Sequence, residues 1–504
     1  MSGEIGACGF EAASLIGGAW RSIAGDGLRS HNPANPDEVV WCGDPVADHV
    51  DEAVAAARAA QPAWAATPIE ARIEALRRFQ AIVKEERETL ARLIGREMGK
   101  VLAEARLEAA AVAGKVDITL EDRVMDRVRG FSVGAAAGVE GLCRFRPHGV
   151  MAVLGPFNFP AHLPNGHIVP ALLLGNTVVF KPSEKTPAVG QMLADLLHRA
   201  GFPPGVVNLV QGGADVAARL VAHEDLDGIL FTGSWPVGRR IMEANLDRPG
   251  RMLALEMGGS NAMVVMPSAD LERAIVEAVR ASFATTGQRC TCTRRIVVHE
   301  SVADRFVSTL AKVASTVLVG PYDSQTPVFM GPLVSEASRT AAIEFQADLA
   351  KRGGRVVVPA CPLDGQGYFL TPGVIEVDRF TRETDCEVFA PIVQVSMAKD
   401  LDDAIEQANA TEFGLASAIF TSERSEFEAF LARSRAGCVN WNAGTAGASS
   451  KLPFGGLGKS GNHRPAGAFS VDYCAMPIAS MEAMLDAPVP PMPAGIGFDP
   501  SNAN

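Results

Sequence analysis

The sequence predicts an α/β protein with two parallel-sheet domains and a small additional element. Three observations lead to this expectation. A chain of 504 residues is too long for one hydrophobic core. From residue 150 onward, short apolar runs alternate with stretches of helical periodicity, which is typical of a parallel sheet covered by helices on both faces. The alternation falls into two blocks with a glycine-rich turn between them, so a site at their junction is expected.

Residues 46–125 are predicted to be helical. Apolar residues recur at three- and four-residue spacing, as in Ile73, Leu76 and Phe79. The segment Thr67-Pro68-Ile69-Glu70 predicts a capping box, with Pro68 at the first helical position. This region is interpreted as structural and is given no part in the chemistry.

A hairpin is expected first, followed by two blocks in which strands and helices alternate. Residues 130–149 alternate between apolar and small or polar residues, which indicates a hairpin at an edge. In the first block, strands are expected at Val150–Leu154, Thr177–Phe180, Val206–Val210 and Gly228–Phe231, and helices at Pro187–Ala200, Ala214–His223 and Val237–Leu246. The second block has expected elements at Asn261–Met266, Leu271–Thr285, Arg294–Val298 and Val302–Val317. The Pro- and Gly-rich tail 486–504 predicts an extended arm.

Composition narrows the class of protein. The net charge is −12 and no block of Lys and Arg occurs, which argues against a nucleic-acid partner. The nine cysteines are scattered, without CxxC pairs or Cys/His clusters, which favours a reducing compartment and argues against a disulfide framework or a metal site. Neither a signal peptide nor a membrane-spanning stretch is found, so no membrane partner is expected and the cytoplasm is the expected location.

Two residues near glycines suggest covalent chemistry. Cys290 lies in the polar segment Thr286-Gly-Gln-Arg-Cys-Thr-Cys292, and Glu256 lies in Leu255-Glu-Met-Gly-Gly259. A thiolate can attack a carbonyl group, and a carboxylate can later activate water. The alternatives are an ordinary buried cysteine and a surface salt bridge.

Seven segments, in this order along the chain, resemble the aldehyde dehydrogenase superfamily. They are Gly155-Pro-Phe-Asn-Phe-Pro160, Phe180-Lys-Pro-Ser-Glu184, Phe231-Thr-Gly-Ser234, Leu255-Glu-Met-Gly-Gly259, Gly287-Gln-Arg-Cys290, Glu387-Val-Phe-Ala-Pro391 and Pro453-Phe-Gly-Gly456. The resemblance covers roughly residues 20–475. It implies an NAD-binding domain of residues 1–129 and 148–256, a catalytic domain of residues 257–455, an oligomerisation element of residues 130–147 and 456–485, and a tail from 486 to 504.

A second group of segments resembles one branch of this superfamily, whose semialdehyde substrate carries two carboxylates. These segments are Arg146-Pro-His-Gly149, Pro160–Ala171, Cys290-Thr-Cys292, Val439-Asn-Trp-Asn442 and Ser460–Pro465. Two alternatives stay open at this point. The chain could oxidise another aldehyde, or it could be an inactive binding or structural protein on the same scaffold.

The resemblance assigns the catalytic roles. Cys290 is the nucleophile that forms a thiohemiacetal and then a thioester. The side-chain amide of Asn158 and the backbone N–H of Cys290 stabilise the oxyanion. Glu256 activates the water that releases the acid, which favours hydrolysis over transfer of the acyl group to a thiol.

The resemblance also assigns cofactor and substrate residues. A carboxylate at Glu184 accepts hydrogen bonds from the ribose hydroxyls and repels a 2′-phosphate, so NAD is expected. The cofactor residues are Lys181, Ser183, Glu184, Gly233, Ser234, Val237, Gly238, Gly258, Glu387 and Phe389. Candidate partners of the substrate carboxylates are His162, Arg289, His463 and Arg464. Alternatively, these four side chains bind backbone carbonyls. A homodimer or a dimer of dimers is expected.

Overall fold

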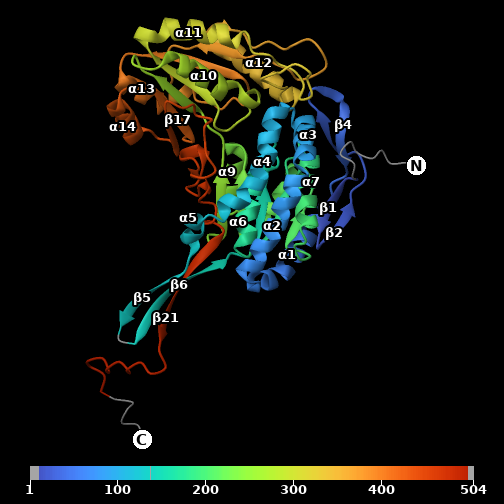
Figure 1. Ribbon diagram of the computed structural model, residues 1–504, viewed down its shortest axis with the longest axis vertical. Helices are drawn as coiled ribbons and strands as arrows, with labels where there is room; N and C mark the ends of the chain where they lie inside the picture. Colours follow the sequence, from blue (N-terminus) through green and yellow to red (C-terminus); the bar gives the residue numbers. More distant parts are fainter. Residues whose placement is uncertain (1–10, 137, 498–504) are drawn as a thin grey trace.

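The computed structural model describes residues 11–136 and 138–497, which form two lobes and a protruding arm (Figure 1). Each lobe is built on a seven-stranded sheet, and the arm is a separate three-stranded sheet. The first residues of the predicted 1–129 segment and the last residues of the predicted tail lie outside the described part of the chain. Two parallel-sheet domains and a small extra element were predicted, and the structure confirms this architecture.

The sheet of the first lobe has the strand order β11-β10-β7-β8-β9-β1-β2, and its strands β7 to β11 are parallel. Every residue of β7, β8 and β10 is buried, which explains why the sequence shows continuous apolar runs here. The bounds are β1 Ala13–Ile16, β2 Ala19–Ser22, β7 Val150–Leu154, β8 Thr177–Lys181, β9 Val207–Leu209, β10 Gly228–Thr232 and β11 Met252–Glu256. A small sheet, β3 Leu28–Asn32 and β4 Asn35–Gly43, lies beside it.

Helices pack around the first sheet. They are α1 His49–Ala66, α2 Ile69–Glu85, α3 Arg87–Met98, α4 Leu102–Thr119, α5 Asp122–Met125, α6 His162–Leu173, α7 Pro187–Arg199, α8 Ala214–Ala222 and α9 Trp235–Glu243. The predicted capping box is wrong: Pro68 precedes α2, and the hydroxyl of Thr67 donates to Ala63 O instead. Thr67 terminates α1, so its side chain completes the last turn of that helix.

The sheet of the second lobe has the order β14-β15-β16-β13-β12-β17-β18 and is parallel except at β14. Its strands are β12 Asn261–Val265, β13 Thr293–His299, β14 Arg355–Val358, β15 Gly373–Glu376, β16 Ile392–Ala398, β17 Ala416–Phe420 and β18 Cys438–Trp441. Its helices are α10 Leu271–Phe283, α11 Glu300–Ala314, α12 Glu336–Lys351, α13 Leu401–Ala408 and α14 Arg424–Arg433. Four residues, 257–260, separate the end of β11 from the start of β12, so the two sheets meet at this turn.

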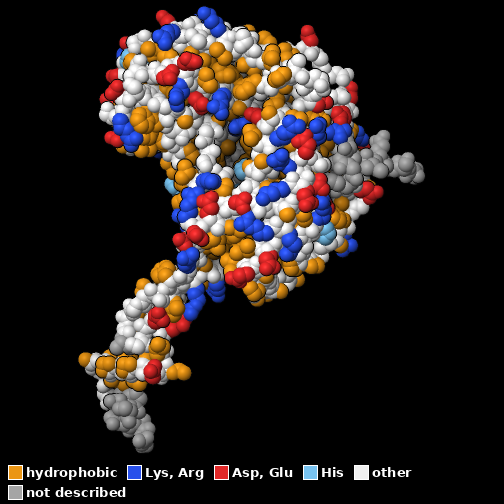
Figure 2. All heavy atoms as spheres, in the orientation of Figure 1, with side chains coloured by type: hydrophobic (Ala, Val, Ile, Leu, Met, Phe, Trp, Pro, Cys, Tyr) orange, Lys and Arg blue, Asp and Glu red, His pale blue; other side chains and the backbone are white. Residues whose placement is uncertain are grey.

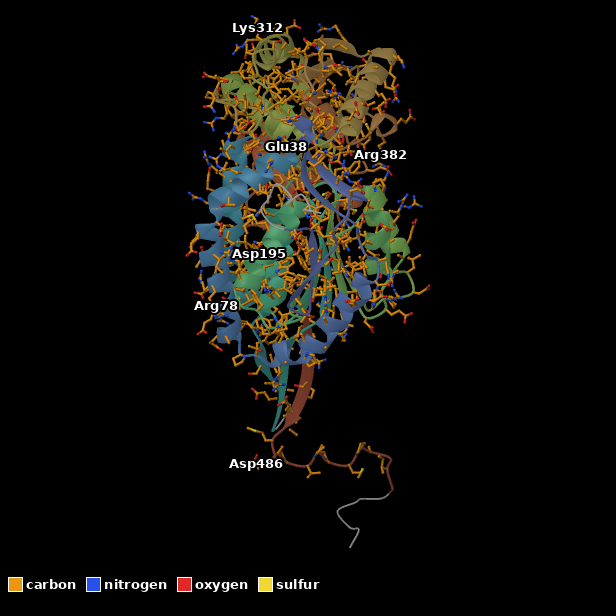
Figure 3. The ribbon with its side chains drawn as sticks, turned by 90° about the vertical axis from the view of Figure 1, so that its right-hand side faces the viewer. Glu38, Arg78, Asp195, Lys312, Arg382 and Asp486 are labelled. Atoms are coloured by element: carbon orange, nitrogen blue, oxygen red, sulfur yellow. The ribbon has the colours of Figure 1, made fainter. Side chains whose placement is uncertain are left out.

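The arm contains β5 Phe131–Ala136, β6 Val139–Pro147 and β21 Ala475–Ala483. The predicted hairpin is confirmed, because β5 and β6 pair antiparallel. The distant strand β21 pairs along the whole of β6, from Ala475↔Pro147 to Ala483↔Val139. Apolar side chains gather at the end of the arm (Figure 2). Met481 of β21 and Leu485, which follows this strand, are both exposed. Seen from the side, the chain turns at Asp486 and runs across that end (Figure 3).

A buried carboxylate joins α3 to the start of α7. Thr186 precedes α7 without capping it through its side chain. Instead, Glu97 of α3 accepts hydrogen bonds from Ala188 N at 2.9 Å and Val189 N at 2.8 Å, and from the hydroxyl of Ser30. Burial raises the pKa of Glu97 to about 7, while these hydrogen bonds oppose the rise. One side chain therefore supplies the cap that the local sequence of α7 lacks.

We expect Glu97→Ala to destabilise the first lobe. The two backbone N–H groups and the Ser30 hydroxyl would lose their acceptor inside the protein, and each such loss costs about 1–3 kcal/mol. Differential scanning calorimetry should show a clearly lower Tm. Glu85→Ala, on the exposed end of α2, is the control and should leave the Tm nearly unchanged. Equal Tm values for the two variants would contradict the capping role.

Candidate active site

Cys290 and Glu256 line the same cavity, although one follows η2 in the second lobe and the other ends β11 in the first. The cavity has a volume of about 220 Å³. His162 and Arg289, two predicted substrate residues, also line it. Four of the predicted site residues therefore meet in one place.

The turn that carries Cys290 has an unusual backbone. The short helix η2, Ala284–Gly287, contains Thr285 and Thr286 at φ of 53° and 56°, and Gly287 follows at 68°. Threonine rarely adopts this left-handed conformation, so the turn persists only because its surroundings hold it. The guanidinium of Arg294 donates to Gly287 O, Arg289 O and Ala390 O and so contributes to this support.

The turn that carries Cys290, residues 284–292, is named the nucleophile turn. Asn261 fixes its other side. This residue starts β12 and is buried. Its Nδ2 donates to Cys290 O at 2.7 Å and to Cys292 O at 2.8 Å, and its Oδ1 accepts from Ala416 N at 2.9 Å. A single amide thus ties the turn to β12 and to the start of β17. The sequence analysis did not single out Asn261 or Arg294 for any role.

The thiol of Cys290 is neutral in this resting arrangement. Burial raises its pKa above the ordinary value, and the carboxylates of Glu387 and Glu256 raise it further. Glu387 is held close by, because its Oε1 accepts from Gly259 N at 2.9 Å. A Cβ at Gly258 would lie 1.8 Å from Glu387 Oε2, so only glycine leaves room for this carboxylate. Formation of the thiolate therefore requires a change in the charge around it.

The carboxyl group of Glu256 is buried without a partner for one of its oxygens. Its Oε2 makes no hydrogen bond, and burial raises the pKa of the group well above the usual range. A raised pKa makes the ionised carboxylate a stronger base, so Glu256 in that form can accept a proton from water. The alternative of a surface salt bridge is excluded by the burial.

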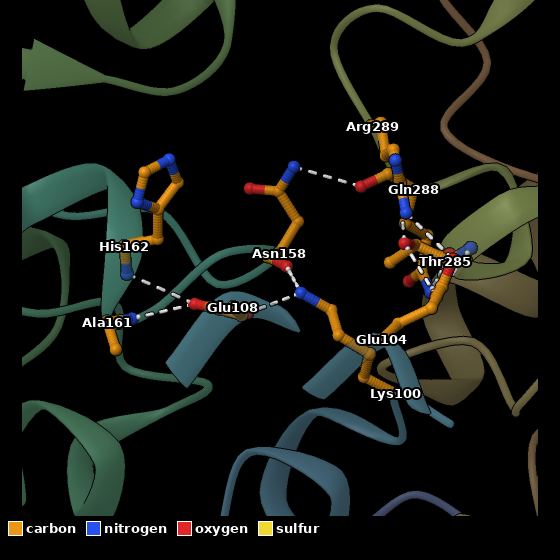
Figure 4. A network of polar contacts seen from close by, with 9 residues as sticks. All are labelled: Lys100, Glu104, Glu108, Asn158, Ala161, His162, Thr285, Gln288 and Arg289. Atoms are coloured by element: carbon orange, nitrogen blue, oxygen red, sulfur yellow. Dashed lines mark hydrogen bonds and ion pairs between the residues drawn. The ribbon is translucent and has the colours of Figure 1, made fainter. Parts of the chain in front are cut away.

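Asn158 lies beside the nucleophile turn, where its Nδ2 donates to Gln288 O at 2.9 Å. Its backbone oxygen accepts from Lys100 Nζ at 2.7 Å, and Lys100 also pairs with Glu108 (Figure 4). Glu108 Oε1 in turn accepts from the backbone N–H groups of Ala161 and His162. A buried ion pair from residues 46–125 therefore holds the segment that carries Asn158 and His162, which is a structural role in keeping with the interpretation of this region.

Arg289 is already paired. Its guanidinium donates to Glu104 Oε1 at 2.7 Å and to Thr285 Oγ1 at 2.8 Å, and it lies over the ring of Phe159. His162 is half-buried against the same ring, its buried Nδ1 makes no hydrogen bond, and burial lowers its pKa to about 4. Arg289 is therefore held by the protein, whereas His162 keeps a polar atom without a partner.

His463 and Arg464 lie elsewhere. Both are exposed, and neither lines the cavity. Arg464 Nη1 donates to His463 O at 3.2 Å, and His463 has a φ of 61°. The structure does not bring these two predicted substrate residues together with Cys290.

Most of the predicted cofactor residues lie at or just after the carboxyl ends of β8, β10 and β11 in the first sheet. Lys181 ends β8, and its Nζ donates to Pro182 O at 2.8 Å; burial lowers its pKa to about 8. Ser183 and Glu184 follow, with Glu184 exposed. Strand β10 leads through Gly233 to α9, whose N-cap Ser234 makes no side-chain cap. Such an edge of a parallel sheet is where nucleotides bind.

The glycines at this edge are needed for packing. A Cβ at Gly233 would lie 2.4 Å from the Phe231 ring, and one at Gly238 would lie 2.3 Å from the Met257 sulfur. Val237 stands 42% exposed on the first turn of α9. Phe389 packs edge-on against Phe157 with 5.8 Å between the ring centroids. The predicted cofactor residues thus run from the strand ends toward Glu387, next to the nucleophile turn.

Two buried basic residues of the cavity wall, Lys115 of α4 and His167 of α6, were not predicted from the sequence. His167 Nδ1 lies 2.8 Å from the Tyr473 hydroxyl, and its Nε2 lies 3.2 Å from Thr232 Oγ1. Burial lowers the pKa of His167 to about 3, so its imidazole is neutral. For Lys115 the available signal was a lysine within a stretch of otherwise small and apolar residues, 109–116.

Within residues 11–136 and 138–497, no helix is long and apolar enough to cross a bilayer. The same part of the chain has no group of three or more His, Cys, Asp or Glu side chains that could hold a metal ion.

Comparison with known proteins places the chain in a family. A family model described as the aldehyde dehydrogenase family matches residues 20–476. An N-succinylglutamate 5-semialdehyde dehydrogenase of Novosphingobium aromaticivorans is 45% identical over 93% of this chain and 98% of its own length. N-succinylglutamate 5-semialdehyde dehydrogenase 2 of Caulobacter vibrioides is 44% identical over 94% of this chain and 96% of its own.

Solved structures agree with this assignment. A 1-pyrroline-5-carboxylate dehydrogenase from Thermus with bound NAD has a TM-score of 0.89 at 29% identity, covering 95% of this chain and 94% of its own. An NADP-dependent enzyme of E. coli has a TM-score of 0.89 at 31% identity, covering 94% and 98%. The chain belongs to the aldehyde dehydrogenase family. It is an oxidoreductase that acts on an aldehyde group, and the superfamily predicted from its sequence motifs is confirmed.

We expect Glu387→Gln to accelerate alkylation of Cys290 by iodoacetamide in the free enzyme. Removing a negative charge near the thiol lowers its pKa and so increases the thiolate fraction at a given pH. Peptide-resolved mass spectrometry at pH 8 would follow Cys290 separately from the exposed Cys361 and Cys386. Glu383→Gln, on the exposed η3 turn (Arg382–Thr384), is the control. An unchanged rate in Glu387→Gln would show that Glu387 does not restrain the thiol.

Proposed function

We propose that this chain catalyses the NAD-dependent oxidation of N-succinyl-L-glutamate 5-semialdehyde to N-succinyl-L-glutamate, a step of the succinyltransferase route of arginine catabolism. The observation that carries the reaction type is the meeting of Cys290 and Glu256 in one cavity, with Asn158 beside the nucleophile turn. The substrate is supported by the relatives named N-succinylglutamate 5-semialdehyde dehydrogenase, which are 43–45% identical over most of the chain.

The proposed chemistry begins with the attack of the Cys290 thiolate on the aldehyde carbon. Asn158 Nδ2 has a second N–H besides the one that Gln288 accepts, and this N–H and the backbone N–H of Cys290 are the proposed donors to the oxyanion. A nicotinamide held by Glu387 and Phe389 would supply the acceptor for the hydride of the thiohemiacetal carbon. Glu256 then takes a proton from water, the resulting hydroxide attacks the thioester, and the acid leaves as the Cys290 sulfur is released.

The residues at the strand ends fit a dinucleotide. Lys181 is buried and donates to one neighbouring carbonyl, which leaves N–H bonds for ribose hydroxyls. The N-terminus of α9 offers unpaired backbone N–H groups to a pyrophosphate. Glu184 is exposed beside Lys181 and would repel a 2′-phosphate, which supports NAD over NADP. Glu387 and Phe389 are the proposed contacts of the nicotinamide half.

We further propose that the enzyme works in the cytoplasm as a homodimer or a dimer of dimers. The eight described cysteines are free, in keeping with a reducing compartment. The arm, β5, β6 and β21, carries exposed apolar side chains that favour pairing between copies. The proposed boundaries stay as predicted: residues 1–129 and 148–256 bind NAD, residues 257–455 are catalytic, and residues 130–147 and 456–485 oligomerise.

Steady-state and burst kinetics test the reaction. We expect NADH formation from N-succinyl-L-glutamate 5-semialdehyde far faster than from propanal, and faster with NAD than with NADP. Cys290→Ala should abolish NADH formation. Glu256→Gln should keep a burst of one NADH per site but lower the steady-state rate by about 10²- to 10⁴-fold, because the hydrolytic base is missing.

Cys361→Ala replaces an exposed cysteine outside the cavity and should behave as the wild type. Comparable rates on propanal would contradict the proposed substrate while keeping the chemistry. No NADH from either aldehyde would contradict the proposed function altogether.

Analytical ultracentrifugation tests the assembly. We expect Phe131→Asp on β5 to shift the protein toward the monomer, because a charge would have to be buried between copies. Leu318→Asp is a matched control, since Leu318 lies in the second lobe and both side chains are 61% exposed. A purely monomeric wild type, or equal dissociation of the two variants, would contradict assembly through the arm.

A further inference from the structure

Lys115 is a buried cation without an anionic partner. The residue is 2% exposed on α4, and its Nζ donates to Gly467 O and to Ser470 Oγ, both at 2.8 Å. Both acceptors are neutral. No carboxylate of residues 11–136 or 138–497 forms an ion pair with it. Lys100, near the start of α4, is equally buried but pairs with Glu108. A buried charge normally has such a partner, because leaving water costs several kcal/mol.

The uncompensated charge faces the catalytic cavity. Lys115 lines this cavity together with Cys290, Glu256 and His162. His162 is also incompletely satisfied, because its Nδ1 is buried without a hydrogen-bond partner. Two polar groups from neighbouring helices, α4 and α6, thus have hydrogen-bonding capacity left in the same wall.

The other cation of the cavity wall, Arg289, already forms an ion pair within the protein. Arg289 pairs with Glu104 at 2.7 Å and also binds Thr285, so its charge is compensated. His162 and His167 are neutral at physiological pH, because burial lowers their pKa to about 4 and about 3. Among the described lining residues, Lys115 is the cation that an incoming anion would meet uncompensated.

We propose that Lys115, assisted by His162 Nδ1, binds a carboxylate of the aldehyde substrate and thereby selects acidic semialdehydes over neutral aldehydes. This inference rests on the proposed function and deepens it. The anion replaces the missing partner of Lys115, and the imidazole donates through Nδ1 in the tautomer that carries its proton there. Burial lowers the pKa of Lys115 to about 8, so most of the lysine is still a cation at neutral pH and binding would strengthen that form.

The selectivity of a Lys115→Met variant tests the proposal. Methionine keeps the length and apolar stem but removes the charge. We expect kcat/KM for N-succinyl-L-glutamate 5-semialdehyde to fall by roughly 10- to 100-fold, mainly through KM, since a charged hydrogen bond is lost. The kcat/KM for propanal should change less than about 3-fold, because propanal carries no anion. Lys115→Arg should restore part of the selectivity. Lys84→Met, exposed at the end of α2, is the control.

Each outcome of the Lys115→Met experiment either supports or overturns the proposed carboxylate subsite. A parallel loss on both substrates would show a structural role and overturn the proposal, as would an unchanged ratio. If the wild type instead prefers another acidic aldehyde, such as succinate semialdehyde, the proposed substrate fails. Lys115 keeps its role only if the Met variant then loses that preference.

A second measurement needs neither a variant nor turnover. N-succinyl-L-glutamate, the proposed product, should protect Cys290 of the wild-type enzyme from iodoacetamide, and its neutral trimethyl ester should protect much less. Equal protection by acid and ester would overturn the carboxylate subsite even if Lys115→Met failed to fold.

Discussion

The nucleophile turn exists because buried donors hold its backbone in a conformation that its own residues disfavour. Thr285 and Thr286 have positive φ values, and neither is a glycine. Arg294 and Asn261 bind the carbonyl oxygens of Gly287, Arg289, Cys290 and Cys292. These donors come from β12 and β13, so the second sheet itself fixes the position of the thiol. The rest of the site is arranged around this fixed point.

The first lobe contributes the opposite wall of the cavity, and it does so through α4. One lysine near the start of this helix, Lys100, forms an ion pair with Glu108 that secures the segment carrying Asn158. A second lysine further along, Lys115, has no such pair and faces the cavity. The two residues are buried alike, so the difference between them lies in the partner that the protein provides. The paired Lys100 before α4 and the unpaired Lys115 on α4 thus differ in the partner provided, although both are buried.

Electrostatics disfavour the thiolate of Cys290 in this arrangement of the site. Burial and two carboxylates raise the pKa of Cys290, while burial alone raises that of Glu256. Glu387 is turned toward the Gly258–Gly259 turn, where it adds negative charge near the thiol. A positively charged nicotinamide and a displacement of Glu387 would both favour the thiolate. The reactive form of the sulfur would then arise only when the other reactants are in place.

Local patterns were enough to predict several parts of this protein. Continuous apolar runs gave β7 and β10 within a residue of their observed ends, because a strand buried on both faces needs apolar side chains throughout. The motifs around Cys290, Glu256 and Asn158 indicated the family and the chemistry. The start of α2 was predicted wrongly from the local sequence. The Thr67 hydroxyl donates to Ala63 O at the end of α1 and does not cap α2.

Only the tertiary structure decided which charged groups remain without partners. Arg289 and Lys115 look alike in sequence as basic residues, yet Glu104 reaches the first and no described carboxylate reaches the second. Their partners lie 185 and more than 350 positions away in the chain. Burial and pairing depend on such distant contacts. The sequence by itself therefore determined the fold class, the family and the candidate pair Cys290 and Glu256, and the folded chain determined the electrostatics of the cavity.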